Sequence, residues 1–175
     1  AKIIGITGTN GKSTTVALLF QILKFNKIKC VIGGNFGFPA CEIKDPGKNG
    51  IIILELSSYQ LDGAKELRLD LATITNITKD HLDYHETFEN YKFSKLKIIN
   101  SLKENGTFFL DAHNKLLNEI VTEKNFKSIN IIKIKKDKNY NYINDNDYLQ
   151  GAHNESNSSI AISIAKHLNI NLKKI

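Results

Sequence analysis

The chain has 175 residues, of which 41% are hydrophobic and 24% charged, which is the composition of one folded globular domain rather than of a disordered chain. Its formal net charge is +6, but the lysines are spread along the chain, so we read them as solvated surface residues and expect no nucleic-acid partner. Cys30 and Cys41 lie in no metal-binding spacing, and no apolar run is long enough to span a membrane. We therefore expect reduced thiols and a cytoplasmic protein without a membrane segment. We also expect a monomer.

Strands and helices alternate along the chain. Apolar runs predict strands over residues 2–7, 29–32, 51–54, 71–77, 107–110 and 129–134. Apolar residues at offsets of three and four predict helices over residues 12–25, 86–100, 115–121 and 153–168. Residues 125–150, rich in Asn, Lys and Asp, have loop character apart from the strand that they contain. This alternation predicts an α/β fold with a mainly parallel sheet flanked by helices, whose ligand site lies beyond the carboxyl ends of the strands.

The first predicted strand is followed by Gly8-Thr9-Asn10-Gly11-Lys12-Ser13-Thr14, which is typical of a P-loop, a loop that binds phosphate. The backbone N–H groups of such a loop and the positive end of the next helix dipole point at one spot. Lys12 would neutralise terminal phosphate oxygens, and Ser13 would coordinate Mg²⁺ held by the same phosphates. The loop is shorter than the general pattern, because its first glycine is Gly8 and position 6 is an isoleucine.

Polar side chains also follow the third predicted strand. Glu55 ends this apolar strand, where a charge is costly unless something binds it, so it is a candidate Mg²⁺ ligand. The alternative is a solvated carboxylate at a strand end. Ser57, Ser58 and Gln60 come next and could donate hydrogen bonds to a substrate, although each could equally cap a helix.

Three further positions are candidates on weaker grounds. His81 follows the fourth strand and could bind a metal or a phosphate, although a lone histidine is more often structural. Lys95 lies on the apolar face of the helix predicted over 86–100, which is unusual unless its side chain snorkels to water. Asn154 and Asn157 lie near the start of the last helix, where either could be a cap.

Together and in this order, these motifs resemble those of the Mur ligases, the ATP-dependent amide-forming enzymes of peptidoglycan precursor synthesis. The resemblance rests on the loop at 8–14, on Asn76-x-x-x-Asp80-His81-Leu82-Asp83 and on Gly151-x-His153-Asn154-x-x-Asn157. Two more segments are similar to the GGNIGxP and ELSSFQL segments of the branch that adds D-glutamate. They are Gly33-Gly34-Asn35-Phe36-Gly37-x-Pro39 and Glu55-Leu56-Ser57-Ser58-Tyr59-Gln60-Leu61.

The resemblance covers residues 3–168 and corresponds only to the central, ATP-binding domain of the family. Residues 1–175 would be this domain without the N-terminal domain that holds the uridine nucleotide and the C-terminal domain that brings the amino acid. The implied enzyme passes the γ-phosphoryl group of ATP to the carboxylate of UDP-N-acetylmuramoyl-L-alanine and then joins D-glutamate to the acyl phosphate. We expect the isolated chain to bind ATP weakly and to lack ligase activity, because the missing domains would be needed to close the site.

The resemblance also implies which residues bind ATP and metal. The loop at 8–14 would bind the triphosphate, and three asparagines would contact the nucleotide: Asn35, Asn154 and Asn157. Ser13 and Glu55 would hold one Mg²⁺ ion, and His81 would serve a second.

The remaining implied roles concern catalysis and the acceptor substrate. Lys95 matches a lysine that CO₂ carbamylates in this family, which would turn a cation into an anionic metal ligand. The residues implied in catalysis are Lys12, His81 and Lys95. The residues implied near the acceptor are Ser57, Ser58 and Gln60.

The chain departs from the family pattern at several positions. Phe36 and Tyr59 replace an isoleucine and a phenylalanine, and Asp111-Ala112-His113-Asn114 replaces a more acidic NxDD-type stretch. The family pattern is lost over residues 111–150, so the local fold there is left open. Other readings also stay open: another ligase of the family, such as the diaminopimelate- or lysine-adding enzyme, or a non-catalytic nucleotide-binding module. A GTPase is disfavoured because no NKxD-type motif stands in a suitable place.

Overall fold

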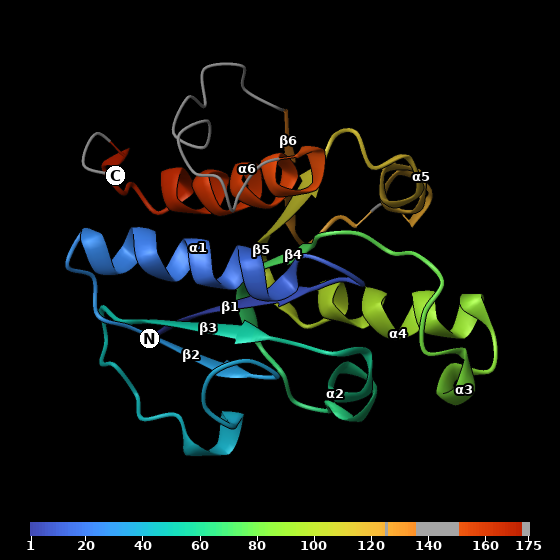
Figure 1. Cartoon of the computed structure of the whole chain (residues 1–175), viewed down its shortest axis with the longest axis horizontal. Helices are drawn as coiled ribbons and strands as arrows, with labels where there is room; N and C mark the ends of the chain where they lie inside the picture. Colours follow the sequence, from blue (N-terminus) through green and yellow to red (C-terminus); the bar gives the residue numbers. More distant parts are fainter. Residues whose placement is uncertain (125, 136–150, 173–175) are drawn as a thin grey trace.

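The computed structural model describes residues 1–124, 126–135 and 151–172, which build a six-stranded sheet between helices (Figure 1). The strands lie in the order β2-β3-β1-β4-β5-β6, and every neighbouring pair is parallel. They are β1 Lys2–Thr7, β2 Cys30–Gly34, β3 Ile51–Glu55, β4 Leu69–Ile74, β5 Leu102–Asp111 and β6 Asn130–Ile134. The helices are α1 Lys12–Phe25, α2 Ser58–Gly63, α3 Leu82–His85, α4 Phe88–Asn100, α5 Lys115–Lys124 and α6 Ala152–His167, with a 3₁₀ turn, η1, at Ala40–Glu42. The predicted α/β fold with a parallel sheet flanked by helices is confirmed.

Helices cover both faces of the sheet and create two hydrophobic cores. On one face α1 and α6 lie side by side (Figure 1), and Leu19 and Ile160 are buried there with Ile4 of β1. On the other face α2, α4 and α5 pack, with Leu61 and Ile98 among the buried residues. Each fully buried side chain of this size contributes about 1.5–3 kcal/mol, so burial is what holds both helical layers on the sheet.

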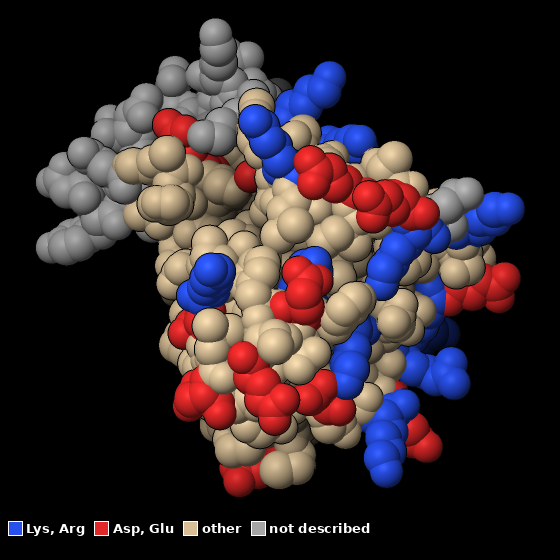
Figure 2. All heavy atoms as spheres, turned by 90° about the vertical axis from the view of Figure 1, so that its right-hand side faces the viewer, with Lys and Arg blue, Asp and Glu red and all other residues tan. Residues whose placement is uncertain are grey.

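The surface over α3, α4 and α5 carries both acidic and basic side chains and is not a purely basic face (Figure 2). Lys97 of α4 pairs with Asp62 of α2, and Lys92 pairs with Glu89 within α4. Exposed pairs of this kind contribute about 0–1 kcal/mol each, so they add little to the two cores. Among the residues that the structure describes, no helix is long and apolar enough to cross a membrane.

The structure differs from the sequence prediction mainly where polar contacts set the end of a strand and where a helix is very short. β4 spans Leu69–Ile74 rather than 71–77, because Thr75 and Asn76 leave the sheet to bond the glycine loop. β5 is longer than the predicted 107–110, and its pairing with β4 shifts register between Leu69 and Leu71. α2, α3 and η1 are too short for apolar periodicity to reveal. Residues 136–150 of the predicted loop segment lie outside the described residues.

Gly8 lies where the glycine loop passes closest to the strand beside it. Its φ is +152°, and a Cβ atom added there would lie 1.9 Å from Thr75 Oγ1 and 3.1 Å from Thr75 Cβ. Thr75 cannot easily move away, because its hydroxyl donates to Asn10 O at 2.6 Å. Only a glycine therefore lets β1 enter the loop at this distance from the end of β4.

We expect Gly8→Ala to lower the free energy of unfolding by about 3 kcal/mol, because it adds a steric clash to an unfavourable backbone conformation. Gly47→Ala is the matched control, since Gly47 also has a positive φ, +95°, but no atom lies within 4 Å of its would-be Cβ. This control should cost only about 1 kcal/mol. Urea denaturation of both variants measures the difference, and equal losses would contradict the close approach of Gly8 to Thr75.

Candidate functional site

The glycine loop joins β1 to α1 and presents the start of the helix without a side-chain cap. Gly11 occupies the N-cap position with φ 80° and ψ 1°, a left-handed conformation that glycine adopts at little cost. Lys12 folds back over the loop, and its Nζ donates to Gly8 O at 3.0 Å and to Thr9 O at 2.8 Å. Ser13 is exposed on the first turn of α1. The positive end of the α1 dipole, the Lys12 amine and the exposed Ser13 hydroxyl thus lie together at the start of this helix, and anion binding there stays a prediction.

The residues after β4 hold this loop in place. Thr9 N donates to Asn76 O at 2.9 Å, and Asn10 N donates to Asn76 Oδ1 at 2.9 Å. Asn76 Nδ2 returns a bond to Asn10 O at 3.0 Å, which Thr75 Oγ1 also reaches. The sequence analysis found Asn76 within a motif but assigned it no role. The signal in the sequence was a pair of polar residues, Thr75 and Asn76, directly after an apolar strand. In the structure both side chains bond to the neighbouring loop.

Glu55 is buried at the carboxyl end of β3, next to the strand that leads into the glycine loop. Its side chain is 1% exposed, and β3 pairs with β1 so that Glu55 lies opposite Ile6. Asn35 Nδ2 donates to Glu55 Oε1 at 2.9 Å, whereas Glu55 Oε2 has no hydrogen-bond partner. A buried carboxylate oxygen without a partner is costly, and a cation would satisfy it. The alternative of a solvated carboxylate is wrong, because Glu55 is not in contact with water.

This donor set suits Mg²⁺ better than a metal that proteins enclose completely. The described part of the chain has no group of three or more His, Cys, Asp and Glu residues that could hold a metal ion. Mg²⁺ keeps several waters and is commonly bound by one or two carboxylates together with substrate phosphates. The unpartnered oxygen of Glu55 and the exposed hydroxyl of Ser13 therefore fit a Mg²⁺ ion that arrives with a polyphosphate.

Lys95 is buried beneath the glycine loop. Its side chain is 2% exposed, its Nζ donates to Gly8 O at 2.8 Å, and this nitrogen lies 4.7 Å from the centre of the Tyr91 ring. Burial and, to a lesser extent, the positive charge of Lys12 lower the pKa of the Lys95 amine from its ordinary 10.5 to about 7, against the opposing effect of Asp80. The alternative of a snorkelling lysine is therefore wrong: this amine faces the loop and is partly neutral near pH 7.

His81 lies at the mouth of the site, where α3 begins. Its side chain is 45% exposed, and its Nε2 lies 3.4 Å from Asp80 Oδ2. Its ring packs edge-on against Tyr59 and Tyr91, with centroids 5.3 Å and 6.0 Å apart. Tyr91 in turn places its hydroxyl 3.0 Å from Thr9 Oγ1, so His81, Lys95 and the glycine loop are linked through one buried aromatic ring.

Ser57, Ser58 and Gln60 form the first turn of α2, and the structure gives each of them a local partner. Ser57 is the N-cap, and its side chain accepts from Gln60 N while Gln60 Oε1 accepts from Ser57 N, a capping box. Ser58 is buried, with its hydroxyl 2.9 Å from His85 Nε2. Burial lowers the pKa of His85 from its ordinary value, against the opposing charge of Asp62. Of the three residues predicted near the acceptor, Gln60 is exposed and Ser57 half-buried, whereas Ser58 faces inward.

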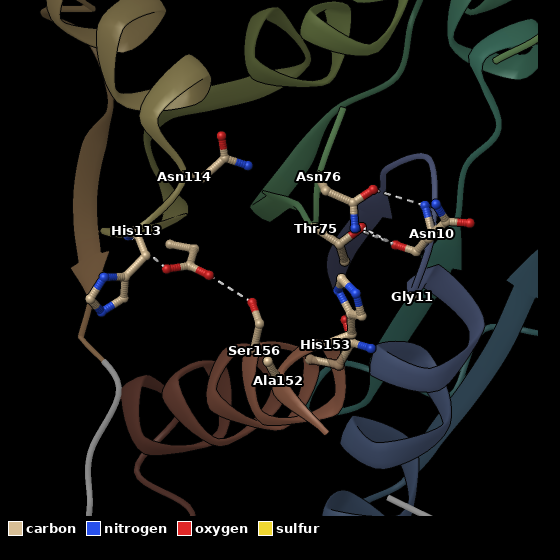
Figure 3. Close-up of a pocket in the computed structure, with 11 residues that line it drawn as sticks. Asn10, Gly11, Thr75, Asn76, His113, Asn114, Ala152, His153 and Ser156 are labelled. Atoms are coloured by element: carbon tan, nitrogen blue, oxygen red, sulfur yellow. Dashed lines mark hydrogen bonds between the residues drawn. The ribbon is translucent and has the colours of Figure 1, made fainter. Parts of the chain in front are cut away.

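A pocket of about 240 Å³ opens beside the glycine loop, between the ends of β4 and β5 and the start of α6 (Figure 3). His153 lies on the side next to Asn10, and His113 lies on the opposite side (Figure 3). The residues that line the pocket are Asn10, Gly11, Thr75, Asn76, Asp111, His113, Asn114, Ala152, His153, Ser156 and Asn157. The pocket therefore adjoins both the glycine loop and the residue from which α1 begins.

Asn157, like Thr75, is a buried polar residue of this pocket. Its amide lies so close to Gly11 that a Cβ added to the glycine would be 2.3 Å from Asn157 Oδ1. Asn157 Nδ2 donates to Asn154 Oδ1 at 3.4 Å. Neither asparagine caps α6, because the N-cap is Gly151 and no side-chain cap bond is present. The sequence analysis treated Asp111, His113 and Asn114 only as a departure from a family pattern and missed their place in the pocket.

We expect Lys95→Met to change how stability depends on pH. Because the folded-state pKa of Lys95 is about 7 and that of an unfolded lysine about 10.5, the unfolded chain binds more protons between these values. Wild-type stability should therefore rise with pH in this window by up to about 1.4 kcal/mol per unit relative to Lys95→Met. Urea denaturation at pH 7 and pH 9 in CO₂-free buffer measures this slope. Lys24→Met, at an exposed position of α1, is the control and should show the wild-type slope. If Lys95→Met also showed the wild-type slope, that result would contradict the buried Lys95 amine.

Comparison with known proteins gives the family. The sequence profile of the Mur ligase middle domain matches residues 6–174. The chain is 36% identical to a UDP-N-acetylmuramoylalanine–D-glutamate ligase of Zymomonas mobilis subsp. mobilis, over 96% of this chain and 38% of that protein. It is 37% identical to the ligase of the same name from Rickettsia felis, over 98% of this chain and 42% of that protein. The chain thus spans about two fifths of the length of these relatives.

Solved structures with low sequence identity share the fold. The MurF ligase from Thermotoga maritima in complex with ADP superposes with a TM-score of 0.73 at 18% identity, over 99% of this chain and 47% of that one. The UDP-N-acetylmuramate:L-alanyl-gamma-D-glutamyl-meso-diaminopimelate ligase from Neisseria meningitides gives a TM-score of 0.70 at 16% identity, over 98% of this chain and 63% of that one. The profile match extends across nearly the whole chain and agrees with the shared fold, and the chain therefore belongs to the Mur ligase middle domain family.

Proposed function

We propose that this chain is the ATP-binding part of a ligase that joins D-glutamate to UDP-N-acetylmuramoyl-L-alanine in peptidoglycan precursor synthesis. The observation that carries the proposal is the buried, unpartnered Glu55 Oε2 near a glycine loop on whose Gly8 O two lysines converge, Lys12 of α1 and Lys95 of α4. The choice of D-glutamate is supported by the relatives, which are D-glutamate ligases by name, and by the segments at Asn35 and at Glu55–Leu61. The enzyme would act in the cytoplasm as a monomer, on small molecules alone.

The glycine loop would bind the triphosphate of ATP. Its amides and the N-terminus of α1 offer fixed dipoles, and Lys12 would exchange its bonds to Gly8 O and Thr9 O for bonds to phosphate oxygens. The adjoining pocket would take the nucleoside, with Asn157 on one wall and Asn154 accepting a hydrogen bond from the Asn157 amide. Asn35 would act on this site through Glu55, whose carboxylate it orients. These residues would bind and align the nucleotide, and alignment is the larger part of catalysis in phosphoryl transfer.

Ser13 and Glu55 would hold one Mg²⁺ ion and His81 a second. When bound, these ions would neutralise charge that develops on the phosphoryl oxygens. The acceptor carboxylate attacks the γ-phosphorus and ADP leaves, after which the amine of D-glutamate attacks the acyl phosphate and phosphate leaves. Lys12 would stabilise the developing negative charge in the first step. Ser57 and Gln60 would lie on the acceptor side, and Ser58 would support them from beneath through His85.

Lys95 would carry a carbamate in the active enzyme. Its neutral amine attacks the carbon of CO₂, a C–N bond forms and one proton is released to solvent. The lowered pKa supports this step, because about half of the amine is unprotonated near pH 7. The carbamate on Lys95 would be an anion close to the Lys12 amine, where the unmodified Lys95 is a second cation when protonated.

Lys12→Ala in the complete ligase should lower the rate of ATP-dependent amide formation by about a hundredfold or more, because it removes the cation that stabilises the transferring phosphoryl group. Phosphate release that depends on both UDP-N-acetylmuramoyl-L-alanine and D-glutamate is the measurement. Lys24→Ala, later in α1, is the matched control and should be active. Full activity of Lys12→Ala would contradict the proposal. Consumption of lysine or diaminopimelate in place of D-glutamate would also contradict it. Residues 1–175 alone, assayed in the same way, should form no amide.

The carbamate gives a separate test. Incubation of the complete ligase with ¹³C-bicarbonate should produce a carbamate ¹³C NMR signal that is absent from Lys95→Arg, because arginine keeps its charge and has no nucleophilic amine. Removal of CO₂ should lower the activity of the wild type. A signal that survives in Lys95→Arg would assign the carbamate to another amine and contradict this role of Lys95.

A further inference from the structure

One hydrogen bond joins the two walls of the pocket beside the glycine loop. Ser156 Oγ of α6 donates to Asp111 Oδ2 at the end of β5, at 2.7 Å and across 45 positions of sequence. The second carboxylate oxygen, Asp111 Oδ1, accepts from His113 N at 2.9 Å. Both oxygens of Asp111 are thus engaged, and all three residues line the pocket (Figure 3).

On the α6 side, this bond fixes the part of the helix that faces the glycine loop. Ser156 immediately precedes Asn157, whose buried amide lies against Gly11. Gly11 is the residue from which α1 begins. A displacement of the first two turns of α6 would therefore move the asparagine that meets the phosphate-binding end of α1.

On the β5 side, the bond fixes the turn that starts α5. Asp111 O accepts from Asn118 Nδ2 at 3.0 Å, and Asn114 Oδ1 accepts from Leu117 N at 3.1 Å. Together with the bond from His113 N to Asp111, these contacts make residues 111–118 one rigid unit. The hydrogen bond between Asp111 and Ser156 joins residues 111–118 to α6 on the opposite wall of the pocket.

We propose that Asp111 and Ser156 are positioning residues that set the width of the pocket for the nucleoside of ATP. This rests on the proposed function of the chain. Neither residue need touch the nucleotide: the carboxylate holds the turn at His113 and the start of α6 at a fixed separation. A hydrogen bond to a charged group is stronger than a neutral one, so the pair can keep this separation at the carboxyl end of β5.

The test is the steady-state kinetics of the complete ligase with Ser156→Ala. The KM for ATP should rise about three- to tenfold, while kcat and the KM values for D-glutamate and the UDP substrate stay within about twofold. Ser156→Thr keeps the hydroxyl and should restore the KM for ATP. Ser101→Ala is the matched control, because Ser101 Oγ makes a 3.0 Å bond to Lys97 O far from the pocket. It should leave all constants unchanged.

Two results would overturn the proposal: an unchanged KM for ATP in Ser156→Ala, or an equal rise in the KM of all three substrates. If Ser156→Ala fails to fold, Asp111→Asn decides, because its amide retains a single acceptor oxygen for two donors and should give the same selective rise. Failure of this positioning role can be distinguished from failure of the proposed function. An active wild type that loses activity in Lys12→Ala, together with an unaffected Ser156→Ala, would reject the positioning role alone.

Discussion

Two lysine side chains converge on one carbonyl oxygen of the glycine loop. Gly8 O accepts from Lys12 Nζ at 3.0 Å and from Lys95 Nζ at 2.8 Å, and no carboxylate pairs with either amine among the described ion pairs. Two positive charges this close repel, and Lys95 is also cut off from water. The lowered pKa of Lys95 follows from this arrangement. A polyphosphate or a carbamate relieves the same repulsion, so the electrostatic cost in the free protein favours the bound state.

The loop can carry these charges because its backbone is held from outside. Thr75 and Asn76 bond to Asn10, and Tyr91 bonds to Thr9 from the far side. The backbone of the loop is therefore fixed in the free protein, so a ligand would not have to order it. Tyr91 also lies beneath the Lys95 amine, so one ring supports both the loop and the lysine.

How much could be predicted from sequence depended on how local each signal was. The glycine loop, the strand before it and the helix after it are consecutive in the sequence. Their pattern was therefore sufficient to predict the bounds of β1 and α1. The end of β4 was predicted too late because the β-branched residues Thr75 and Ile77 follow the strand, and tertiary bonds from Thr75 and Asn76 override their propensity. The capping box at Ser57 and Gln60 was readable in principle, but a helix of six residues shows no periodicity.

The remaining contacts join residues far apart in sequence. His85 meets Ser58 across 27 positions and Ser156 meets Asp111 across 45, and no local pattern reports either pair. The burial of His85 depends on where α3 places it against Ser58 of α2, and neither helix shows a periodic apolar pattern. Site residues that act through a partner are therefore less visible in a sequence than those that present a charge to the ligand.

Glu55 shows why the site should bind its metal and its nucleotide together. The protein provides a buried carboxylate with one free oxygen, a serine hydroxyl at Ser13 and, farther out, His81, but no cage of three acidic or histidine ligands within the described ranges. Mg²⁺ sheds water reluctantly and needs six oxygen ligands, so such a site holds it weakly until phosphate oxygens complete the shell. Conversely, the unpartnered Glu55 oxygen would repel a triphosphate that came without a cation. Each ligand thus removes the penalty that the other would meet, and this is a coupling free energy between them.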